Sequence, residues 1–300
     1  MLYLRKNNQW LFDINKNMFN GIEIIENADL KNYCTFKIGG RGTIVFPKNV
    51  YELKKIVKEC DKNNLNYFIL GNGSNLLFSD FEINTILVSL KYFNEIRQVK
   101  KDEVFVGAGV NLFPLNIYLK NHNLSELEWS YGIPASMGGA IFMNAGAFGH
   151  SISENILNVK VLKCGKVENI SKKNLKFSYR KSNINGIILG ATMKFKEGNL
   201  DEIAFLQQDY LERRKISQPY DKFSAGSVFK RNIEKNIIPA KIIDTFGLKG
   251  TRIGGAEISK KHAGFIVNNG DAKAIDVLAL IEYIKYKTGE DLELEIIYVK

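Results

Sequence analysis

The stretch YFILGNGSNLL, residues 67–77, decides how the first half of the chain folds. Tyr67–Leu70 is an apolar run of strand length, and it leads directly into the glycine-rich loop Gly71–Asn75. Two glycines allow backbone N–H groups to turn towards an anion, and Ser74 and Asn75 add further donors. The pattern predicts a buried strand followed by a loop suited to a pyrophosphate. A plain tight turn is the alternative, because Gly and Asn are common turn residues.

The loop does not match the dinucleotide fingerprint of Rossmann folds. That fingerprint needs a third glycine for helix–strand packing, and Leu76 stands in its place. No helical pattern opens after the loop either. VGAGV, residues 106–110, is a second loop of the same weak kind. A nucleotide held by these loops therefore requires a different fold.

The segments around this loop carry alternating helix and strand patterns. Asn49–Asn64 predicts a helix capped by Asn49, because apolar residues recur at helical spacing from Leu53 to Cys60. A second clear helix, Asp201–Lys215, is expected to bury Ile203, Leu206, Tyr210 and Leu211, and its start is the expected domain boundary. The remaining patterns predict strands near Ile83–Leu90, Val104–Gly107, Asn158–Leu162, Gly186–Phe195 and Asp291–Val299, and helices over Leu112–Asn121 and Ala272–Lys287, the last with Asp271 as N-cap and Gly289 as stop.

Gly132–Gly149, GIPASMGGAIFMNAGAFG, consists largely of small residues. Small residues serve a closely packed helix with flanking loops, and they equally serve a surface where backbone approaches a flat ligand. The sequence leaves both interpretations open.

Composition sets the class of protein. A single core rarely grows beyond roughly 250–300 residues, so 300 residues predict two or three subdomains. The net charge of +10, from 42 Lys and Arg against 32 Asp and Glu, admits nucleic acid, acidic membrane or phosphate-rich ligands. The basic residues are spread along the chain, however, and no RNA-binding signature that combines aromatic and basic residues is present. We therefore expect neither nucleic acid nor membrane as a partner.

The three cysteines, Cys34, Cys60 and Cys164, form no C-x-x-C pair and are odd in number, which suits a reducing cytosol. The first residues lack the apolar stretch of a signal peptide, and no run approaches the ~20 apolar residues of a membrane span. The histidines are dispersed, so we expect no metal site. These features predict a cytoplasmic protein, and we expect it to act as a monomer.

The motifs occur in a recognisable order. CTFKIGG (34–40) precedes GNGSNLL (71–77), VGAGV (106–110) and the small-residue stretch 132–149, and then come SYRKS (178–182), SAGSVFK (224–230), IIDTFGLKGTRIGGAEISKKHAGFIVN (242–268) and a final segment with Glu295. This ordered set, from about residue 33 to the end, resembles the UDP-N-acetylenolpyruvoylglucosamine reductase family, in its shorter type.

The resemblance implies an α+β fold. It has an FAD-binding domain of the vanillyl-alcohol oxidase and p-cresol methylhydroxylase type, in two subdomains, followed by a smaller C-terminal α/β substrate domain. On this basis residues 1–32 are an N-terminal lead, 33–200 the FAD-binding domain and 201–300 the substrate domain. FAD is expected to be held without a covalent bond. The cofactor-binding residues implied are Gly71, Asn72, Gly73, Ser74 and Asn75 at the pyrophosphate, and Gly132, Ile133, Pro134, Ala135, Ser136, Gly138, Gly139, Asn144 and Gly146 along the flavin and the rest of the cofactor.

The resemblance also implies the reaction. NADPH would reduce FAD, and UDP-N-acetylglucosamine enolpyruvate would then be reduced to UDP-N-acetylmuramate, a step of peptidoglycan precursor synthesis and so of cell-wall biogenesis, cell shape, cell cycle and cell division. Two rivals stay open. One is another FAD-dependent oxidoreductase of this fold that acts on a sugar or hydroxy acid, and the other is a basic nucleic-acid-binding protein.

Three residues match the family's catalytic positions. Arg180 would bind the substrate carboxylate, and Ser227 would donate the proton. By themselves they read as a surface arginine and a turn serine. Glu295 is supported by the sequence directly, because strand alternation places it on the same face as the apolar Ile297 and Val299. A strand edge open to solvent is the alternative for Glu295.

Three further positions need comment. Cys34 stands where the family usually has Asn or His, and Asn232 replaces a usual proline, which puts the local loop shape in doubt. His262 admits a general-base role, but a histidine bonded to backbone is the preferred interpretation.

Overall fold

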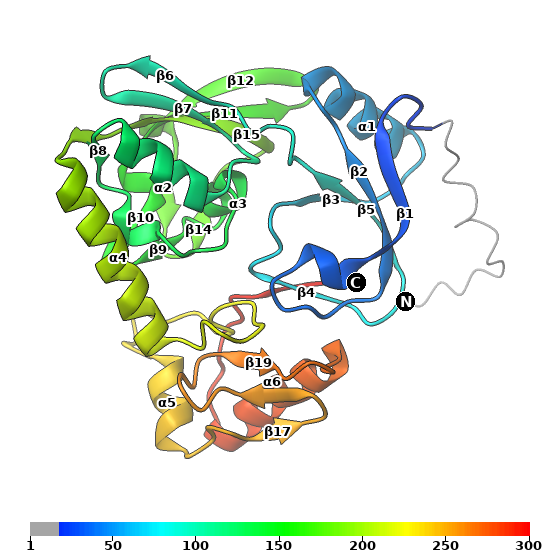
Figure 1. Cartoon of the computed structure of the whole chain (residues 1–300). Helices are drawn as coiled ribbons and strands as arrows, with labels where there is room; N and C mark the ends of the chain where they lie inside the picture. The colour runs from blue at the N-terminus through cyan, green and yellow to red at the C-terminus, as the bar shows by residue number, and fades with distance from the viewer. Residues whose placement is uncertain (1–17) are drawn as a thin grey trace.

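The computed structural model describes residues 18–300. Figure 1 shows three parts: a blue N-terminal sheet with its helix, a green sheet covered by helices, and an orange C-terminal domain below them. The last strand of the chain returns from the C-terminal domain to the N-terminal part. The parts are therefore joined by more than their linkers.

The N-terminal part is built on a four-stranded sheet with the order β1-β2-β5-β3. Its elements are β1 Glu23–Asp29, β2 Arg41–Phe46, α1 Val50–Lys62, β3 Tyr67–Leu70, β4 Leu76–Phe78 and β5 Ile83–Ser89. Asn49 caps α1 through a hydrogen bond from the Glu52 backbone N–H to its side chain, as the sequence predicts. β2, β3 and β5 are parallel, so α1 serves as the crossover between β2 and β3.

β2 is buried on both faces, and it separates two hydrophobic cores. Val45 packs into one core with α1 and the second sheet. Its neighbours Ile44 and Phe46 point the other way and pack into a core that includes the C-terminal domain. The first sheet and the C-terminal domain thus share one continuous core, although they lie far apart in sequence.

The second part is an antiparallel five-stranded sheet with the order β12-β11-β15-β7-β6. Its strands are β6 Ile96–Lys100, β7 Glu103–Gly107, β11 Ile156–Lys163, β12 Lys166–Ser171 and β15 Ile187–Lys194, with helices α2 Leu112–Asn121 and α3 Met137–Phe142 and short pairs β8 Leu124–Ser125, β9 Gly146–Ala147, β10 His150–Ser151, β13 Phe177–Ser178, β14 Lys181–Ser182 and β16 Lys196–Glu197. α2 and α3 pack on one face of this sheet (Figure 1). The opposite face carries polar residues such as Asn158 and Lys160.

A long helix, α4 Leu200–Ser217, connects this part to the C-terminal domain. That domain contains α5 Pro239–Thr245, the three-stranded sheet β17 Arg252–Ile253, β18 Ala256–Ile258 and β19 Ile266–Asn268, α6 Ala274–Thr288 and β20 Ile297–Val299. β20 pairs in parallel with β4. The Asn268 amide Nδ2 donates to the Phe36 carbonyl at 3.0 Å, which adds a second tie between the C-terminal domain and the N-terminal part.

Most predicted elements are confirmed, and three details are wrong. Lys273, not Asp271, occupies the N-cap position of α6, while Gly289 ends the helix in a left-handed conformation as expected. The terminal strand covers only Ile297–Val299, so Glu295 precedes it. The fully buried residues of α4 are Ile203, Gln207 and Arg214, whereas Leu206, Tyr210 and Leu211 are only partly buried. Within residues 18–300, every helix is too short or too polar to span a lipid bilayer.

Candidate active site

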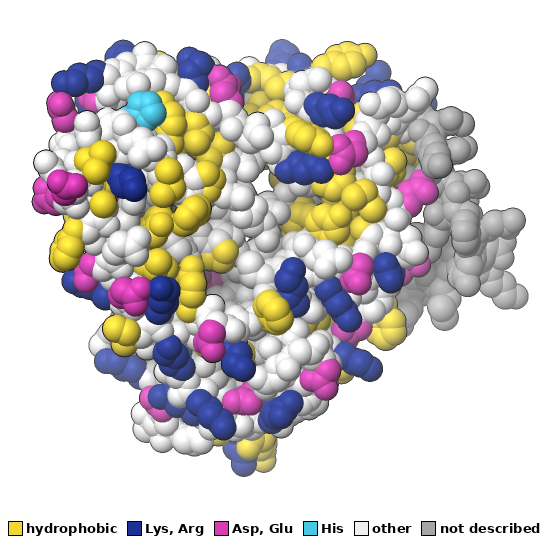
Figure 2. Space-filling model, in the orientation of Figure 1, with side chains coloured by type: hydrophobic (Ala, Val, Ile, Leu, Met, Phe, Trp, Pro, Cys, Tyr) yellow, Lys and Arg dark blue, Asp and Glu magenta, His cyan; other side chains and the backbone are white. Residues whose placement is uncertain are grey.

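A cleft of about 1940 Å³ lies where the three parts meet. Figure 2 shows the molecule hollowed at the centre of this face, with hydrophobic side chains on the walls. Single-ligand pockets usually measure roughly 300–1,000 Å³. This cleft therefore has room for two ligands side by side.

The cleft is strongly cationic. Seven Lys and Arg residues line it, namely Lys37, Lys91, Arg180, Arg214, Lys222, Arg231 and Lys241, against a single carboxylate, Glu295. Low-dielectric walls concentrate the field of like charges in a cleft. Ligands that carry phosphate or carboxylate groups therefore suit it best.

Every residue predicted for the site lines this one cleft. The loop 71–75 enters it directly after β3. Among the described residues, the backbone N–H groups of residues 72–75 donate to no protein acceptor, which leaves them available to an anion. The Asn75 amide instead donates to the Glu295 carbonyl at 2.9 Å, and it thereby ties the loop to the segment before β20.

Both glycines of this loop are needed for packing. A Cβ at Gly71 would lie 2.4 Å from Ser136 Oγ, and one at Gly73 would collide with the backbone of Tyr33 and Cys34. Gly73 also has a φ of 65°, a backbone conformation that residues other than glycine rarely adopt. The loop is therefore held against the segment 132–146 on one side and residues 33–34 on the other.

The small-residue segment 132–149 both packs as a helix and lines the cleft. Residues 137–142 form the short helix α3, and Ala140 and Ile141 are buried in it. The residues around the helix line the cleft as backbone-rich walls, including Ile133, Pro134 and Ala135 before it and Asn144 and Gly146 after it. Only small side chains permit both the helix packing and the close approach of a ligand.

Arg180 and Glu295 form the main ion pair of the cleft. Arg180 Nε donates to Glu295 Oε1 at 2.6 Å, and the two side chains are 20% and 11% exposed. Arg180 lies in the turn between β13 and β14 with a φ of 55°, an unfavourable conformation for arginine that recurs at functional sites. Burial raises the pKa of the Glu295 carboxyl, and the nearby guanidinium opposes this shift.

Ser227 reaches Glu295 through backbone pairing across the C-terminal domain. The Glu295 N–H donates to the Val228 carbonyl at 2.8 Å, so the residue after Ser227 is bonded directly to Glu295. The Ser227 hydroxyl lines the cleft and bonds to no other described residue. Arg180, Ser227 and Glu295 are thus brought into the same cleft from three distant segments.

Four buried polar side-chain atoms lack a hydrogen-bond partner among residues 18–300, and three of them belong to residues of the cleft. They are Asn144 Oδ1, Arg214 Nε and Glu295 Oε2. Buried polar atoms in native proteins are nearly always paired with protein, water or ligand, so a polar ligand in the cleft could satisfy these three. Together with the free N–H groups of the loop, they fit a large polar cofactor such as FAD.

Local hydrogen bonds explain the residues found at positions 34, 232 and 262. Cys34 is buried behind the loop, its thiol donates to the Ile38 carbonyl, and burial raises its pKa. The Asn232 N–H donates to the Ile237 carbonyl at 3.0 Å, a bond that proline could not form. His262 Nδ1 accepts from the Gly264 N–H at 3.2 Å and burial lowers the ring's pKa, so backbone bonding is the better interpretation of this residue.

Arg214 is a deeply buried cleft residue that sequence reasoning missed. It is only 7% exposed, although arginine is among the residues least often buried. A signal was present, because Ile203, Gln207, Tyr210 and Arg214 follow helical spacing along α4. The expectation that arginines are solvated hid this pattern.

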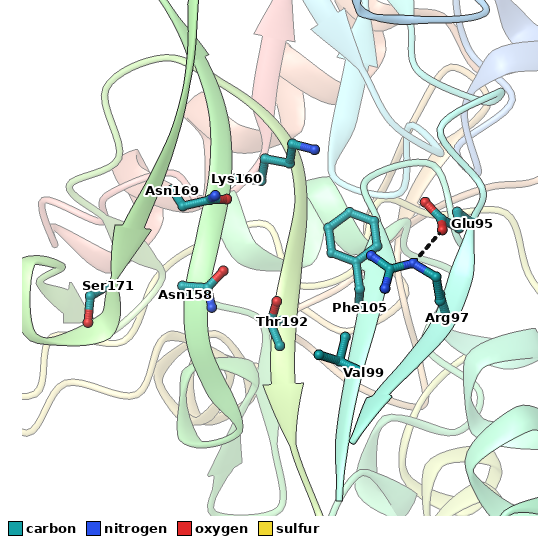
Figure 3. A pocket seen from close by; sticks show the side chains of 9 residues that line it. All are labelled: Glu95, Arg97, Val99, Phe105, Asn158, Lys160, Asn169, Ser171 and Thr192. Atoms are coloured by element: carbon teal, nitrogen blue, oxygen red, sulfur yellow. Dashed lines mark hydrogen bonds and ion pairs between the residues drawn. The ribbon is translucent and has the colours of Figure 1, made fainter. Parts of the chain in front are cut away.

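A second, smaller hollow of about 440 Å³ lies on the outer face of the five-stranded sheet (Figure 3). Its ion pair, Glu95 with Arg97 at 2.8 Å, is more than half exposed on both sides. No residue predicted for the site lies there. No group of three or more His, Cys, Asp or Glu within residues 18–300 is arranged to bind a metal ion.

Two family models match the chain. One, described as an FAD binding domain, matches residues 42–171. The other, described as the C-terminal domain of UDP-N-acetylenolpyruvoylglucosamine reductase, matches residues 218–299. The predicted α+β architecture, an FAD-binding domain followed by a smaller C-terminal domain, is confirmed.

Relatives similar over nearly the whole chain carry the same description. UDP-N-acetylenolpyruvoylglucosamine reductase of Clostridium novyi is 41% identical over 293 residues, which cover 95% of this chain and 94% of the relative. The reductase of Thermotoga maritima is 40% identical over 275 residues, covering 89% and 95%. The crystal structure of the Thermus caldophilus reductase matches with a TM-score of 0.80 at 33% identity, covering 93% of this chain and 99% of that one.

Proposed function

Because the chain belongs to the UDP-N-acetylenolpyruvoylglucosamine reductase family, we propose that Arg180, Ser227 and Glu295 carry out this family's reaction in the cleft. The protein is an FAD-dependent oxidoreductase that reduces UDP-N-acetylglucosamine enolpyruvate to UDP-N-acetylmuramate with NADPH, in peptidoglycan precursor synthesis. The observation that carries the assignment of roles is the Arg180–Glu295 pair beside Ser227 in a cationic cleft.

FAD supplies the redox chemistry when bound, by accepting a hydride from NADPH and passing one to the enolpyruvyl double bond. The protein must therefore orient the substrate, balance charge and supply a proton. The free N–H groups of residues 72–75 are suited to hold the pyrophosphate, and the walls formed by residues 132–146 are suited to lie along the rest of the cofactor.

Arg180 is suited to bind the substrate carboxylate. Hydride addition to the enol ether increases the negative charge on that carboxylate. Only Nε of Arg180 is engaged by Glu295, so its two terminal nitrogens remain available to a second carboxylate. The guanidinium can thus bridge Glu295 and the substrate, and Glu295 keeps it in one orientation.

Ser227 supplies the proton that completes the lactyl ether. A serine hydroxyl is a weak acid, so it needs neighbouring charge to help it. The backbone bond between Glu295 and Val228 keeps Ser227 close to the Arg180–Glu295 pair. A nearby cation favours the ionised form of an acid, and Ser227 lies in a cleft lined by seven Lys and Arg residues against one carboxylate.

We also propose the division of labour between the parts of the chain. Residues 33–200 hold FAD and residues 201–300 bind the substrate, a division supported by family matches that fall within these ranges. A cytoplasmic location is supported by three free thiols, Cys34, Cys60 and Cys164, which suit a reducing compartment. A role in cell division follows from the peptidoglycan step, and we propose that the protein acts as a monomer.

The purified protein should be yellow, and NADPH should bleach its flavin absorbance. Addition of UDP-N-acetylglucosamine enolpyruvate should restore the colour as UDP-N-acetylmuramate forms, which an absorbance titration with product analysis will measure. Reduction of the flavin by a sugar or hydroxy acid, with no response to NADPH, would support the rival oxidoreductase instead. A colourless protein that binds nucleic acid would contradict both.

FAD should be held without a covalent bond. The flavin-side stretch before His150 consists of small and apolar residues, and the His150 ring pairs with Glu154 at 3.1 Å. Acid precipitation should release all yellow colour into the supernatant. Colour that remains with the protein pellet would show a covalent link.

A further inference from the structure

Arg214 carries a buried positive charge with no carboxylate partner among residues 18–300. Nη1 donates to the Gln218 side-chain oxygen at 3.2 Å, and Nη2 donates to the Trp129 carbonyl at 3.5 Å. A guanidinium has five N–H groups, so three of them, including that on Nε, have no partner in this part of the chain. Arg214 is thus both deeply buried and incompletely bonded.

Such a charge is unfavourable unless an anion completes it. Burial lowers the pKa of the Arg214 guanidinium, yet arginine keeps its proton at neutral pH. The Phe148 ring, whose centroid is 5.5 Å from Cζ, compensates only part of the lost hydration. Arg214 lines the cleft, so an anionic group bound there could pair with its charge.

The surroundings of Arg214 indicate which ligand provides that partner. A Cβ at Gly132 would lie 3.6 Å from Arg214 Cδ, so the backbone of this segment passes directly over the side chain. Three of the residues in contact with it, Trp129, Gly132 and Phe148, lie in the range that matches an FAD binding domain. The fourth, Gln218, begins the range that matches the C-terminal domain. The guanidinium thus faces the cofactor's side of the cleft, although α4 leads into the C-terminal domain.

We propose that Arg214 anchors FAD by binding a negatively charged group of the cofactor. The planar guanidinium presents paired N–H donors, which match the two oxygens of a phosphate or the carbonyl edge of the flavin ring. That group is either the pyrophosphate or the ring edge that gains negative charge on reduction. The proposal rests on FAD as the cofactor, and it is independent of which substrate is reduced.

The test compares Arg214→Met with Arg213→Met. Methionine keeps the apolar stem without the charge. Arg213 is the neighbouring residue on α4, 61% exposed and paired with Asp209 at 2.8 Å, so it is a matched control. Thermal unfolding without and with added FAD, and the Kd of FAD from reconstitution of the apoprotein, are measured for each.

Without FAD, Arg214→Met should unfold at the wild-type temperature or higher, because it lacks the unpaired charge. Its Kd for FAD should rise at least about tenfold, since a charge-assisted hydrogen bond is lost. Added FAD should therefore raise its unfolding temperature less than it does in the wild type. Arg213→Met should behave as wild type in all three measurements.

The midpoint potential of bound FAD distinguishes the two groups. If Arg214 holds the pyrophosphate, Arg214→Met weakens the binding of oxidised and reduced FAD equally, and the midpoint potential is unchanged. If it holds the ring edge, the reduced form is weakened more, and each tenfold difference lowers the two-electron potential by about 30 mV. Arg214→Lys, which keeps the charge but not the paired donors, should fall between wild type and Arg214→Met.

Two results would overturn the proposal. The first is that both Arg214→Met and Arg214→Gln destabilise the apoprotein and leave the FAD affinity unchanged, or that both variants fail to fold. Arg214 would then have a structural role. The other is normal FAD affinity with weakened binding of UDP, which would assign the residue to the substrate. A wild type that binds FAD but does not reduce the enolpyruvyl substrate contradicts the proposed function alone, because the FAD measurements still apply.

Discussion

Ser227→Ala should separate the two half-reactions. NADPH should bleach the variant's flavin at a near-normal rate, because that hydride transfer needs no proton donor for a carbanion. Formation of the lactyl product should slow by ~10²–10⁴-fold, the usual contribution of a general acid. Stopped-flow absorbance measures the first half-reaction, and product analysis in a single turnover measures the second.

The alanine substitution should change little else. The Ser227 hydroxyl bonds to no other described residue, so the unfolding temperature should stay close to that of the wild type. In deuterated solvent the wild-type product should carry deuterium on the carbon next to the carboxylate. Ser171→Ala removes a hydroxyl from the outer hollow of Figure 3 and serves as the control. Equal loss of NADPH oxidation and product formation would make Ser227 a binding or structural residue.

Glu295→Gln should lower turnover by at least ~10²-fold, the lower end for acid–base groups. The substitution nearly keeps the shape of the side chain but removes the charge that faces Arg180 at 2.6 Å. The guanidinium then loses its fixed counter-ion, and neither its orientation towards the substrate nor its support of proton delivery is maintained. Flavin content should not change, and steady-state kinetics with a flavin assay measure both quantities.

The raised pKa of Glu295 predicts how turnover should depend on pH. Burial raises the pKa of Glu295 above the ordinary glutamate value, so the carboxylate takes up its proton at a higher pH than an exposed glutamate. If the ionised form supports Arg180, wild-type turnover should fall as the pH drops through that raised pKa. Glu295→Gln should lack this acid limb.

Glu293→Gln is the matched control for this residue. Glu293 lies two residues earlier, pairs with Lys230 at 2.6 Å and has a side chain that is 73% exposed, and exposed pairs contribute little. Its turnover and pH profile should match those of the wild type. A Glu295→Gln enzyme within a few-fold of wild-type turnover would show that the buried carboxylate has only a structural role.

Parts of the candidate site could be predicted from the sequence where a short stretch carries the pattern. The loop 71–75 was identified from its two glycines and the strand before it, because a sharp backbone turn leaves a mark in a few adjacent residues. Glu295 was predicted from strand alternation to be partly buried, and its side chain is 11% exposed. It precedes β20, however, so the burial comes from the packing of the segment before the strand and not from strand alternation. Arg180 and Ser227 were recognisable only through the resemblance, since a single arginine or serine has no local signature.

Elements whose cause lies within one turn or one strand could be predicted from the sequence alone. Asn49 caps α1 by accepting a hydrogen bond from the Glu52 N–H three residues later, and Gly289 ends α6 by its own left-handed backbone conformation. These effects act over a few residues, so periodicity and side-chain type are enough to predict them.

Which distant groups meet depends on the packing of the whole chain, and the sequence alone did not predict it. Asp80 accepts hydrogen bonds from the Ala274 and Ile275 N–H groups at the start of α6, so a residue 194 positions away satisfies donors that the sequence assigned to Asp271. The Arg180–Glu295 pair spans 115 residues, and the burial of Arg214 depends on the packing of α4 against Gly132. Each of these contacts arises because a folded chain must satisfy its buried charges and backbone donors with the groups that packing brings within hydrogen-bond distance. The spacing of residues along the sequence does not encode that distance.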